Sequence, residues 1–336
     1  MRKFIVLVSA LRLVSANQDV WSQVQYSVSD LGSGQAVAVN NTGVTLVTVS
    51  GESELVYPNG SQLMSSQMYG GSFNNPVALN DANTIVNGAP GGYDYIHFDY
   101  SGSQEDLAEL APPGNNAVYA INNASYPNVV GVYTKSGNNY VLCYPDLPLS
   151  GGTNGMLTGL PGIGYDVNNA CQIAIGGGSA EIYNGSTGSL TYICAGDALS
   201  INNSEQVVGK IAGSSHLFLY DDGTVHDLGF AVASCSINDS GLIIGDTSTG
   251  SPFIYSNSSM TGLNSLLPLN SGWVVESATG INDSGQICGY GINPSGQTDA
   301  FLLTPNPTPE PSSLALLGVG FVGFIAYGRR KRRVVG

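Results

Sequence analysis

A short turn-like segment recurs along this chain and constrains its fold more than any other feature. Two copies are identical, Ile-Asn-Asp-Ser-Gly at 237–241 and at 281–285, and each precedes a short apolar run that ends in glycine. Looser copies keep an aliphatic residue before an asparagine. The seven asparagines stand 34 to 46 residues apart and are Asn40, Asn80, Asn122, Asn168, Asn202, Asn238 and Asn282. A period near 40 residues is typical of β-propellers and repeat arrays.

The residues between these anchors predict four short β-strands per repeat. In the repeat anchored by Asn202, the turn is followed by 207–209, by the aromatic segment 216–220 and by 224–229. Such runs are rich in β-branched and aromatic residues and are bounded by Gly, Asn, Asp or Ser, which indicate strands and hairpins. We interpret Ile-Asn-Asp-Ser-Gly as a turn in which Asn and Asp tolerate the left-handed conformation and Gly accepts a positive φ. The leading aliphatic residue is expected to point into the sheet core.

Seven repeats of four strands predict an all-β, seven-bladed β-propeller over residues 17–303. The last repeat supplies only three strands and ends at 300–303, whereas 26–32, before the first anchor, has the pattern of a fourth strand. Pairing these two segments would close the ring and cover two sheet edges that otherwise invite aggregation.

Both ends of the chain have the patterns of targeting segments. Residues 1–16 combine a basic start, an apolar run and small residues, which predicts a signal peptide cleaved after Ala16, although Arg12 interrupts the apolar run and a buried first strand is the alternative. At the other end, a proline-rich linker at 304–311 leads into an apolar segment within 312–336. Its apolar part has the minimum length for a transmembrane helix, and the basic residues after it should stay in the cytoplasm.

The last 30 or so residues resemble the PEP-CTERM sorting signal of exported bacterial proteins. The resemblance lies in an ordered motif followed by an apolar helix and a basic terminus, carried by Pro309, Glu310, Pro311, Arg329, Arg330, Lys331, Arg332 and Arg333. It implies recognition by an exosortase-type membrane protease and cleavage near Pro309–Pro311. It also implies transient inner-membrane anchoring by the C-terminal helix, a final position at the cell surface or outside the cell, and a Gram-negative host that makes exopolysaccharide.

The repeats over 30–303 are similar to the HAF-type repeats of bacterial extracellular proteins. The best match is the aromatic strand and Asp-Leu-Gly of 216–229, followed by Ile-Asn-x-x-Gly-x-x-x-Gly at 237–245. No repeat has an intact His-Ala-Phe, and the first four are degenerate. This family has no assigned biochemical activity, so the resemblance implies export and fold and leaves the function open.

The charge of the body excludes one class of partner. Residues 17–308 hold 23 acidic residues against Lys135 and Lys210, a balance of −21 with no arginine. Because nucleic-acid binding requires Lys and Arg to displace counterions, we expect no nucleic-acid partner. Such a surface could attract cations.

Few residues suggest chemistry. The histidines are His97, His216 and His226, the last beside Asp227 in sequence, and the acidic groups that draw attention are Asp221–Asp222 and Glu105–Asp106 with Glu109. HExxH, GxSxG and P-loop motifs do not occur, so we expect strand histidines and solvated acidic loops, no catalytic residues and no enzyme. No motif defines the ligand-binding residues.

Metal and disulfide chemistry receives equally weak support. Stacked Asn and Asp turns could hold calcium, but their spacing lacks the Asp-x-Asp-x-Asp-Gly pattern of a calcium loop, so we expect no metal and no cofactor. The five cysteines lack CxxC spacing; they are Cys143, Cys171, Cys194, Cys235 and Cys288. Most are expected to be small buried residues, with a disulfide formed after export as the alternative.

Three functions fit these patterns. The first is an exported structural or adhesion protein of the cell surface or extracellular matrix. The second is a carbohydrate-binding, lectin-like propeller, which exposed members of the 18 tyrosines would favour. The third is a polysaccharide hydrolase or lyase, which would need an Asp/Glu pair with a histidine in the central channel.

Overall fold

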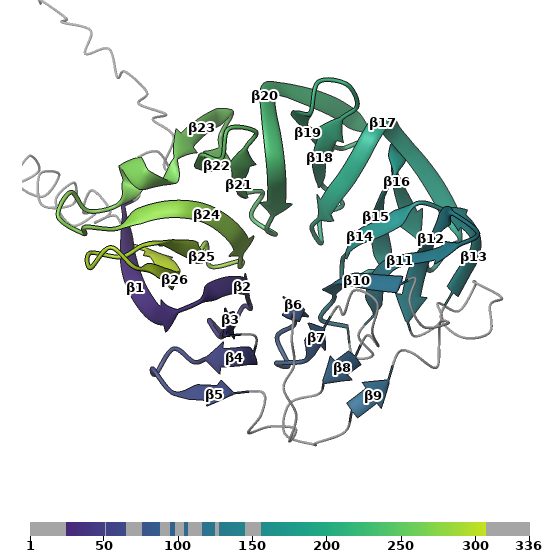
Figure 1. Ribbon diagram of the computed structural model, residues 1–336. Helices are drawn as coiled ribbons and strands as arrows, with labels where there is room; N and C mark the ends of the chain where they lie inside the picture. Colours follow the sequence, from purple (N-terminus) through teal and green to yellow (C-terminus); the bar gives the residue numbers. More distant parts are fainter. Residues whose placement is uncertain are drawn as a thin grey trace, which may run out of the picture.

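The computed structural model describes residues 25–50, 52–64, 76–87, 95–97, 104–106, 116–124, 128–144 and 156–306. In these ranges the protein is all-β apart from one 3-10 turn, η3 (Leu263–Leu266). Its antiparallel sheets are arranged around a common axis (Figure 1). This is a propeller-like architecture, as the repeats predict.

Three four-stranded sheets hold the first part of the chain in sequence order. The first contains β2 (Gln35–Val39), β3 (Thr45–Val49), β4 (Glu52–Val56) and β5 (Gln62–Met64). The second contains β6 (Pro76–Leu79), β7 (Ile85–Asn87), β8 (Tyr95–His97) and β9 (Gln104–Asp106). The third contains β10 (Asn116–Ile121), β11 (Val129–Lys135), β12 (Asn138–Tyr144) and β13 (Met156–Pro161).

The next three repeats form one ten-stranded sheet rather than separate sheets. It runs through β14 (Ile163–Val167), β15 (Gln172–Gly176), β16 (Gly178–Asn184), β17 (Ser189–Ile201), β18 (Val207–Ile211), β19 (His216–Asp221), β20 (Thr224–Ile237), β21 (Ile243–Thr247), β22 (Pro252–Ser256) and β23 (Ser259–Gly262). The long strands β17 and β20 join the repeats because each changes partner midway. The first part of β17 pairs with β16, and the part after Gly196 pairs with β18. Gly196 permits the change, since its φ is +145° and a Cβ there would lie 2.0 Å from the Lys210 carbonyl oxygen.

The last sheet combines the two ends of the described chain. Its order is β1 (Tyr26–Ser33), β26 (Thr298–Pro305), β25 (Ile287–Ile292) and β24 (Val274–Ile281). Val28 lies opposite Leu303 and Asp30 opposite Phe301, which confirms the predicted pairing of the first segment with the final repeat. β26 continues to Pro305, two residues beyond the repeat boundary expected from the sequence.

The core lies between neighbouring sheets and is built from equivalent positions of the repeats. Phe218 and Phe301 are fully buried, and each lies opposite a glycine of the preceding strand, Gly209 in β18 or Gly289 in β25, which continue past these glycines to Ile211 and Ile292. A Cβ on either glycine would meet the phenylalanine ring at 2.8 Å and a carbonyl oxygen of the inner strand closer still. The recurrent glycine therefore makes room for the aromatic residue of the third strand.

The anchor turns follow the innermost strands, and in every segment whose fifth residue the structure describes, that residue is left-handed. Gly241 and Gly285 have φ of +76° and +74°, whereas their Asn and Asp neighbours do not have positive φ. The glycine prediction is confirmed, but Asn and Asp do not adopt the left-handed conformation at these positions. In copies that lack glycine at this position, Asn83, Cys171 and Glu205 take this conformation instead, with φ of 60° to 63°.

Candidate functional site

The seven anchor asparagines form a closed ring of hydrogen bonds around the axis. Each is buried and donates from Nδ2 to the backbone carbonyl of the next anchor, at 2.8 to 3.3 Å. The last link runs from Asn282 back to Asn40 at 2.9 Å and closes the circle. This ring ties every repeat to its neighbours at one end of the molecule.

The same carboxamides also complete their own turns. The Oδ1 atom of Asn238 accepts hydrogen bonds from the backbone N–H groups of Ser240 at 3.1 Å and Leu242 at 2.9 Å. An anchor must therefore donate and accept through one buried side chain, which a carboxamide can do and an ionised carboxylate cannot.

A second ring lies beside the first and is made by the residue after each anchor. Its members are Asn41, Asp81, Asn123, Asn169, Asn203, Asp239 and Asp283. Each accepts at Oδ1 a hydrogen bond from the backbone N–H of its counterpart in the preceding repeat, at 2.6 to 2.9 Å. This hydrogen bond requires only an acceptor oxygen, which explains why both Asn and Asp occur at this position.

This turn end of the axis encloses a cavity of about 160 Å³ lined by both rings. Its carboxylates are engaged by amides: Asp239 accepts from the Nδ2 of Asn203 at 2.7 Å, and Asp283 from that of Asn41 at 2.8 Å. Within the part of the chain that the structure describes, no three His, Cys, Asp or Glu side chains are grouped to hold a metal ion.

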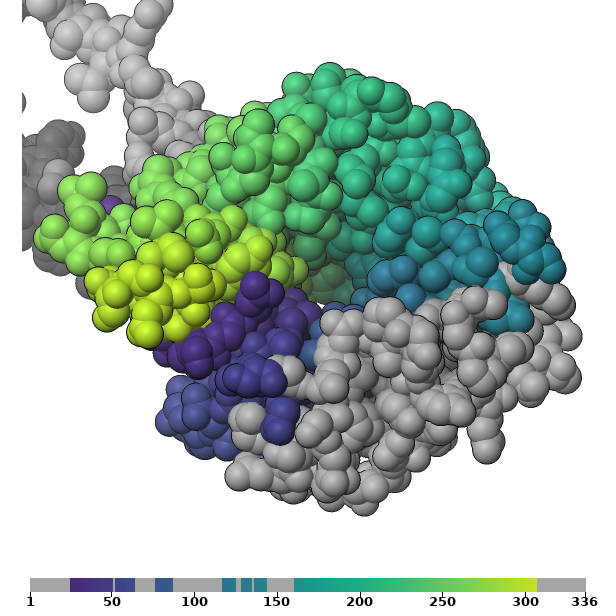
Figure 2. Space-filling view, in the orientation of Figure 1, coloured from purple at the N-terminus to yellow at the C-terminus, as the bar shows by residue number. Residues whose placement is uncertain are grey.

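A larger cavity of about 320 Å³ occupies the opposite half of the axis. The aliphatic residues that precede the anchors line the turn-side cavity, and several of them line this one too, so they lie between the two halves. The expectation that they point into the sheet core is therefore incomplete, because they also face the axis. In the space-filling view, the surface is hollowed where the inner strands meet (Figure 2).

β-Bulges set which side chains line the larger cavity. The inner strands β2, β6, β10, β14 and β17 each shift register at the residue three positions before the anchor. A bulge adds an unpaired residue and re-aims its side chain. The bulged residues Val37, Val77, Tyr119, Tyr165 and Leu199 all contribute to the cavity wall.

Two of these bulged residues are tyrosines in neighbouring sheets. The ring centroids of Tyr119 and Tyr165 lie 5.7 Å apart with the ring planes at 39°. Tyr119 is 38% exposed although it belongs to the inner strand β10. Burial, followed by the Asp197 carboxylate and Tyr119, raises the pKa of Tyr165. The pair forms an aromatic wall of the cavity.

Polar groups stand beside this wall. The Oδ2 atom of Asp166 accepts from the Ser200 hydroxyl at 2.8 Å and from the Ile201 backbone N–H at 3.0 Å. Burial raises the pKa of the Asp166 carboxyl, although these hydrogen bonds oppose the shift. Ser236 and Thr279 add hydroxyls to the lining.

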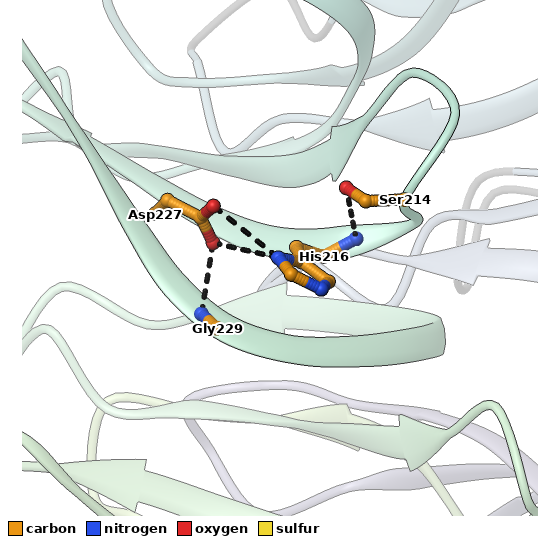
Figure 3. A network of polar contacts seen from close by, with 4 residues as sticks. All are labelled: Ser214, His216, Asp227 and Gly229. Carbon is orange, nitrogen blue, oxygen red and sulfur yellow. Dashed lines mark hydrogen bonds and ion pairs between the residues drawn. The ribbon is translucent and has the colours of Figure 1, made fainter.

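One pair of titratable side chains lies away from the axis. The Nδ1 atom of His216 is 3.2 Å from both carboxylate oxygens of Asp227, which also accepts from the Gly229 backbone N–H at 2.8 Å (Figure 3). The Gly229 and His216 hydrogen bonds lower the pKa of Asp227. Ser214 completes the group only through the His216 backbone N–H, at 3.2 Å, so it is not aligned with the imidazole as a nucleophile would be.

The histidine that contacts Asp227 is distant from it in sequence. Asp227 contacts His216 across β19 and β20 rather than the adjacent His226, because successive strand residues point to opposite faces. Asp222 has a φ of 46° at the β19–β20 hairpin, where the sequence places a turn. His97 lies in strand β8, as expected. Glu105 and Asp106 lie in strand β9, so the expectation of an acidic loop is wrong for these two residues. Glu109 falls outside the described residues.

Cys171, Cys194, Cys235 and Cys288 are free thiols. Cys143 and Cys288 are buried, whereas Cys171, Cys194 and Cys235 are half-buried, so the expectation that most of the five are buried is wrong. Burial raises the pKa of Cys288 and of Cys235 to about 12. These thiols are poor nucleophiles, since the thiolate is the reactive form.

The predicted signal peptide with Ala16 and the predicted C-terminal helix lie outside the described residues. Within the residues that the structure does describe, no helix has the length and hydropathy to cross a membrane.

Comparison with solved structures supports the propeller-like class. A streptogramin B lyase structure aligns with a TM-score of 0.53 and 11% identity, covering 84% of this chain and 98% of the other. Virginiamycin B lyase from Staphylococcus aureus aligns at 0.51 and 10%, covering 83% and 99%. An oligogalacturonate lyase in complex with manganese aligns at 0.50 and 10%, covering 84% and 97%. At these identities the likeness shows the fold alone.

Comparison with protein families identifies the tail. Residues 307–333 match the PEP-CTERM protein-sorting motif, which confirms that expectation and implies an exported protein with a C-terminal sorting signal, processed by an exosortase-type system. The curated proteins contain no match to this chain.

Sequence reasoning did not find the aromatic wall or the two rings. The signal for the rings is in the sequence, since the anchor is Asn in every copy and the next residue is Asn or Asp. The aromatic wall had no such signal, because it depends on bulges.

Proposed function

We propose that this protein is an exported structural or adhesion protein of the cell surface or extracellular matrix, built as a seven-bladed propeller of HAF-type repeats. The observation that carries the proposal is the pair of seven-membered hydrogen-bond rings, joined to a sorting motif that starts directly after the closing sheet. Such a body is a rigid, ring-shaped module, and such a tail delivers it to the outside of the cell.

Seven blades follow if the ten-stranded sheet is divided where β17 and β20 change partners. Each resulting unit then contains one anchor turn, and the unit formed by β24, β25, β26 and β1 completes the circle. The two seven-membered rings support this division.

A non-enzymatic role is supported by how the polar groups are used. The Asn and Asp side chains of the turn end hold the repeats together, and the His216–Asp227 pair is exposed on an outer surface. A polysaccharide hydrolase or lyase is the weakest alternative, because its only support is that the structurally similar proteins include lyases.

A carbohydrate-binding propeller is the second candidate, and one observation favours it. Tyr119 and Tyr165 expose adjacent rings to a cavity on the axis. Aromatic rings combine a flat apolar face with a polar hydroxyl, which suits sugars.

The export proposal is tested by expressing the full chain in a bacterium with an exosortase-type protease and in the matched strain without it. Mass spectrometry should find a product cleaved near Pro309–Pro311 at the surface or in the matrix of the first strain, and an uncleaved chain in membranes of the second. A Glu310→Ala variant should remain uncleaved, while Glu276→Ala, in the exposed part of the body, should be processed normally. Equal products in both strains would refute sorting by this system.

A structural or adhesion role is tested in the processing strain. Deleting the gene should reduce matrix-bound biomass, and the chain truncated after Asn306 should not restore it. Undiminished matrix and attachment after deletion would contradict that role.

A further inference from the structure

The cavity opposite the anchor turns has features that neither export nor a scaffold requires. We propose that the 320 Å³ cavity beside Tyr119 and Tyr165 binds a neutral saccharide, with the two rings as the stacking wall and Asp166 as the hydrogen-bond acceptor. This inference names a site and a ligand class for the carbohydrate-binding candidate above and rests on it.

The aromatic wall is built and held by the fold. Tyr119 and Tyr165 are bulged residues at equivalent positions of adjacent inner strands, β10 and β14, so the backbone fixes both rings at the cavity. Tyrosine loses little conformational entropy on binding and offers a large rigid contact area. Two rings 5.7 Å apart at 39° form an angled surface for the C–H face of a pyranose.

The space in front of the wall follows from the other repeats. At the same position they carry smaller side chains, including Val37, Val77 and Thr279. The cavity is therefore asymmetric, with aromatic rings on one side and open volume on the other. A ring of seven equal repeats would not need this difference, whereas a site for one ligand does.

Polar groups near the wall can exchange hydrogen bonds with sugar hydroxyls. Asp166 holds its acceptor oxygens at the lining through Ser200, Ile201 and Val167. The Thr279 hydroxyl donates to the Ala36 carbonyl at 2.8 Å, which leaves its oxygen able to accept. The cavity therefore combines the two aromatic rings with a lining rich in polar groups, and a sugar can use both, because it carries hydroxyl groups as well as C–H faces.

Charge selects neutral sugars over uronates. Two carboxylates contribute to the charge near the wall: Asp166 lines the cavity, and Asp197 raises the pKa of Tyr165. One basic residue is near them, because Lys210 lies opposite Asp197 in the strand pairing. The balance at the site is negative, and the body as a whole carries −21 over residues 17–308. A carboxylate-bearing sugar would meet like charge in a partly desolvated cavity.

The position of the cavity also suits a protein tethered by its tail. The side chain of Gln286, in the last anchor turn, donates to the Thr304 hydroxyl at 3.2 Å, so the tail leaves from the turn end of the molecule. The cavity lies on the other side of the anchors. A tethered molecule therefore presents its saccharide site away from the membrane.

The site is tested with the purified full chain on an array of neutral gluco-, manno-, galacto- and xylo-oligosaccharides, with oligogalacturonates as the anionic set. At least one neutral set should be retained, and Tyr119→Ala and Tyr165→Ala should each weaken its retention about tenfold. Val37→Trp, which fills the cavity without altering the tyrosines, should abolish it. Tyr192→Ala removes a 61% exposed tyrosine from the outer part of β17 and should change nothing.

The outcomes separate this site from the proposals on which it rests. A processed, exported chain that retains no neutral sugar refutes the site and leaves export intact. Retention that survives the tyrosine and Val37 variants supports a lectin-like propeller but refutes this cavity. Oligogalacturonate retention equal to that of neutral sugars refutes the charge argument. Circular dichroism on each variant verifies the fold.

Discussion

The anchor asparagines show how much one side chain can be required to do. Asn168 is buried, accepts hydrogen bonds at Oδ1 from its own turn, and donates from Nδ2 to the Asn202 carbonyl at 3.0 Å. Its neighbour Asn169 is exposed, and its Oδ1 accepts one hydrogen bond, from the Asn123 backbone N–H at 2.8 Å. The two adjacent asparagines are therefore subject to different chemical demands.

This difference predicts opposite responses to the same substitution. Asn168→Asp should lower the free energy of unfolding by roughly 3 kcal/mol at neutral pH, because a buried carboxylate replaces a donor that the ring requires. Asn169→Asp should change it by less than about 0.5 kcal/mol, since the acceptor is kept. Urea denaturation measures both. Acidification should reduce the Asn168→Asp penalty, because a protonated carboxyl can donate, and equal penalties would contradict the division of roles.

At the scale of elements, the closing strand β1 is held by a tyrosine with an unusual environment. Tyr26 is fully buried in the cluster with Phe301 and Leu303, and burial raises the pKa of its hydroxyl to about 12. Because the folded pKa exceeds the ordinary value of 10.0, the folded state keeps the proton longer than the unfolded state. Stability from this group is complete below pH 10 and is lost as pH rises toward 12.

Tyr26 therefore predicts a pH-dependent test of the closing strand. For the parent, the free energy of unfolding should fall by about 1.4 kcal/mol per pH unit from this group between pH 10 and 12. Tyr26→Phe should remove this part of the slope and keep the packing, while Tyr26→Ala should cost roughly 3–5 kcal/mol at every pH. Denaturation series at pH 8 and 11 distinguish them. An unchanged alkaline slope in Tyr26→Phe would refute the burial argument.

The elements also show which features the sequence makes visible. The repeats and the closing strand were predictable because turn residues and alternating apolar residues are local signals. The aromatic wall of the cavity was not predictable, because a bulge inserts one residue and changes which side chains face inward. Tyr119 and Tyr165 are such residues, and nothing in their own segments marks a bulge. The contact between His216 and Asp227 likewise depends on strand register.

At the scale of the whole molecule, the two ends of the axis differ in their relation to the tail. The anchor turn before β25 and the turn 293–297 after it lie at opposite ends of that six-residue strand, which separates them by about 20 Å. Ser284 and Ser295 are exposed at these two ends. The tail leaves on the side of Ser284.

This geometry predicts which end a tethered molecule exposes. In cells that retain the tail, a maleimide probe too large to enter the space under the protein should label Ser295→Cys several-fold faster than Ser284→Cys. In the chain truncated after Asn306 the two rates should converge, and the parent with its native cysteines gives the background. Faster labelling of Ser284→Cys on tethered protein would mean that the molecule sits the other way up.

The position of the last strand has a mechanical consequence. The Asn306 backbone N–H donates to the Gln25 carbonyl at 2.8 Å, so the tail departs where β26 is flanked by β1 on one side and β25 on the other. A drag force on the anchored protein acts along β26 and stretches both ladders of hydrogen bonds at once instead of peeling them singly. Because many hydrogen bonds must break together under shear, the sheet of β1, β26 and β25 that closes the ring is well placed to resist flow.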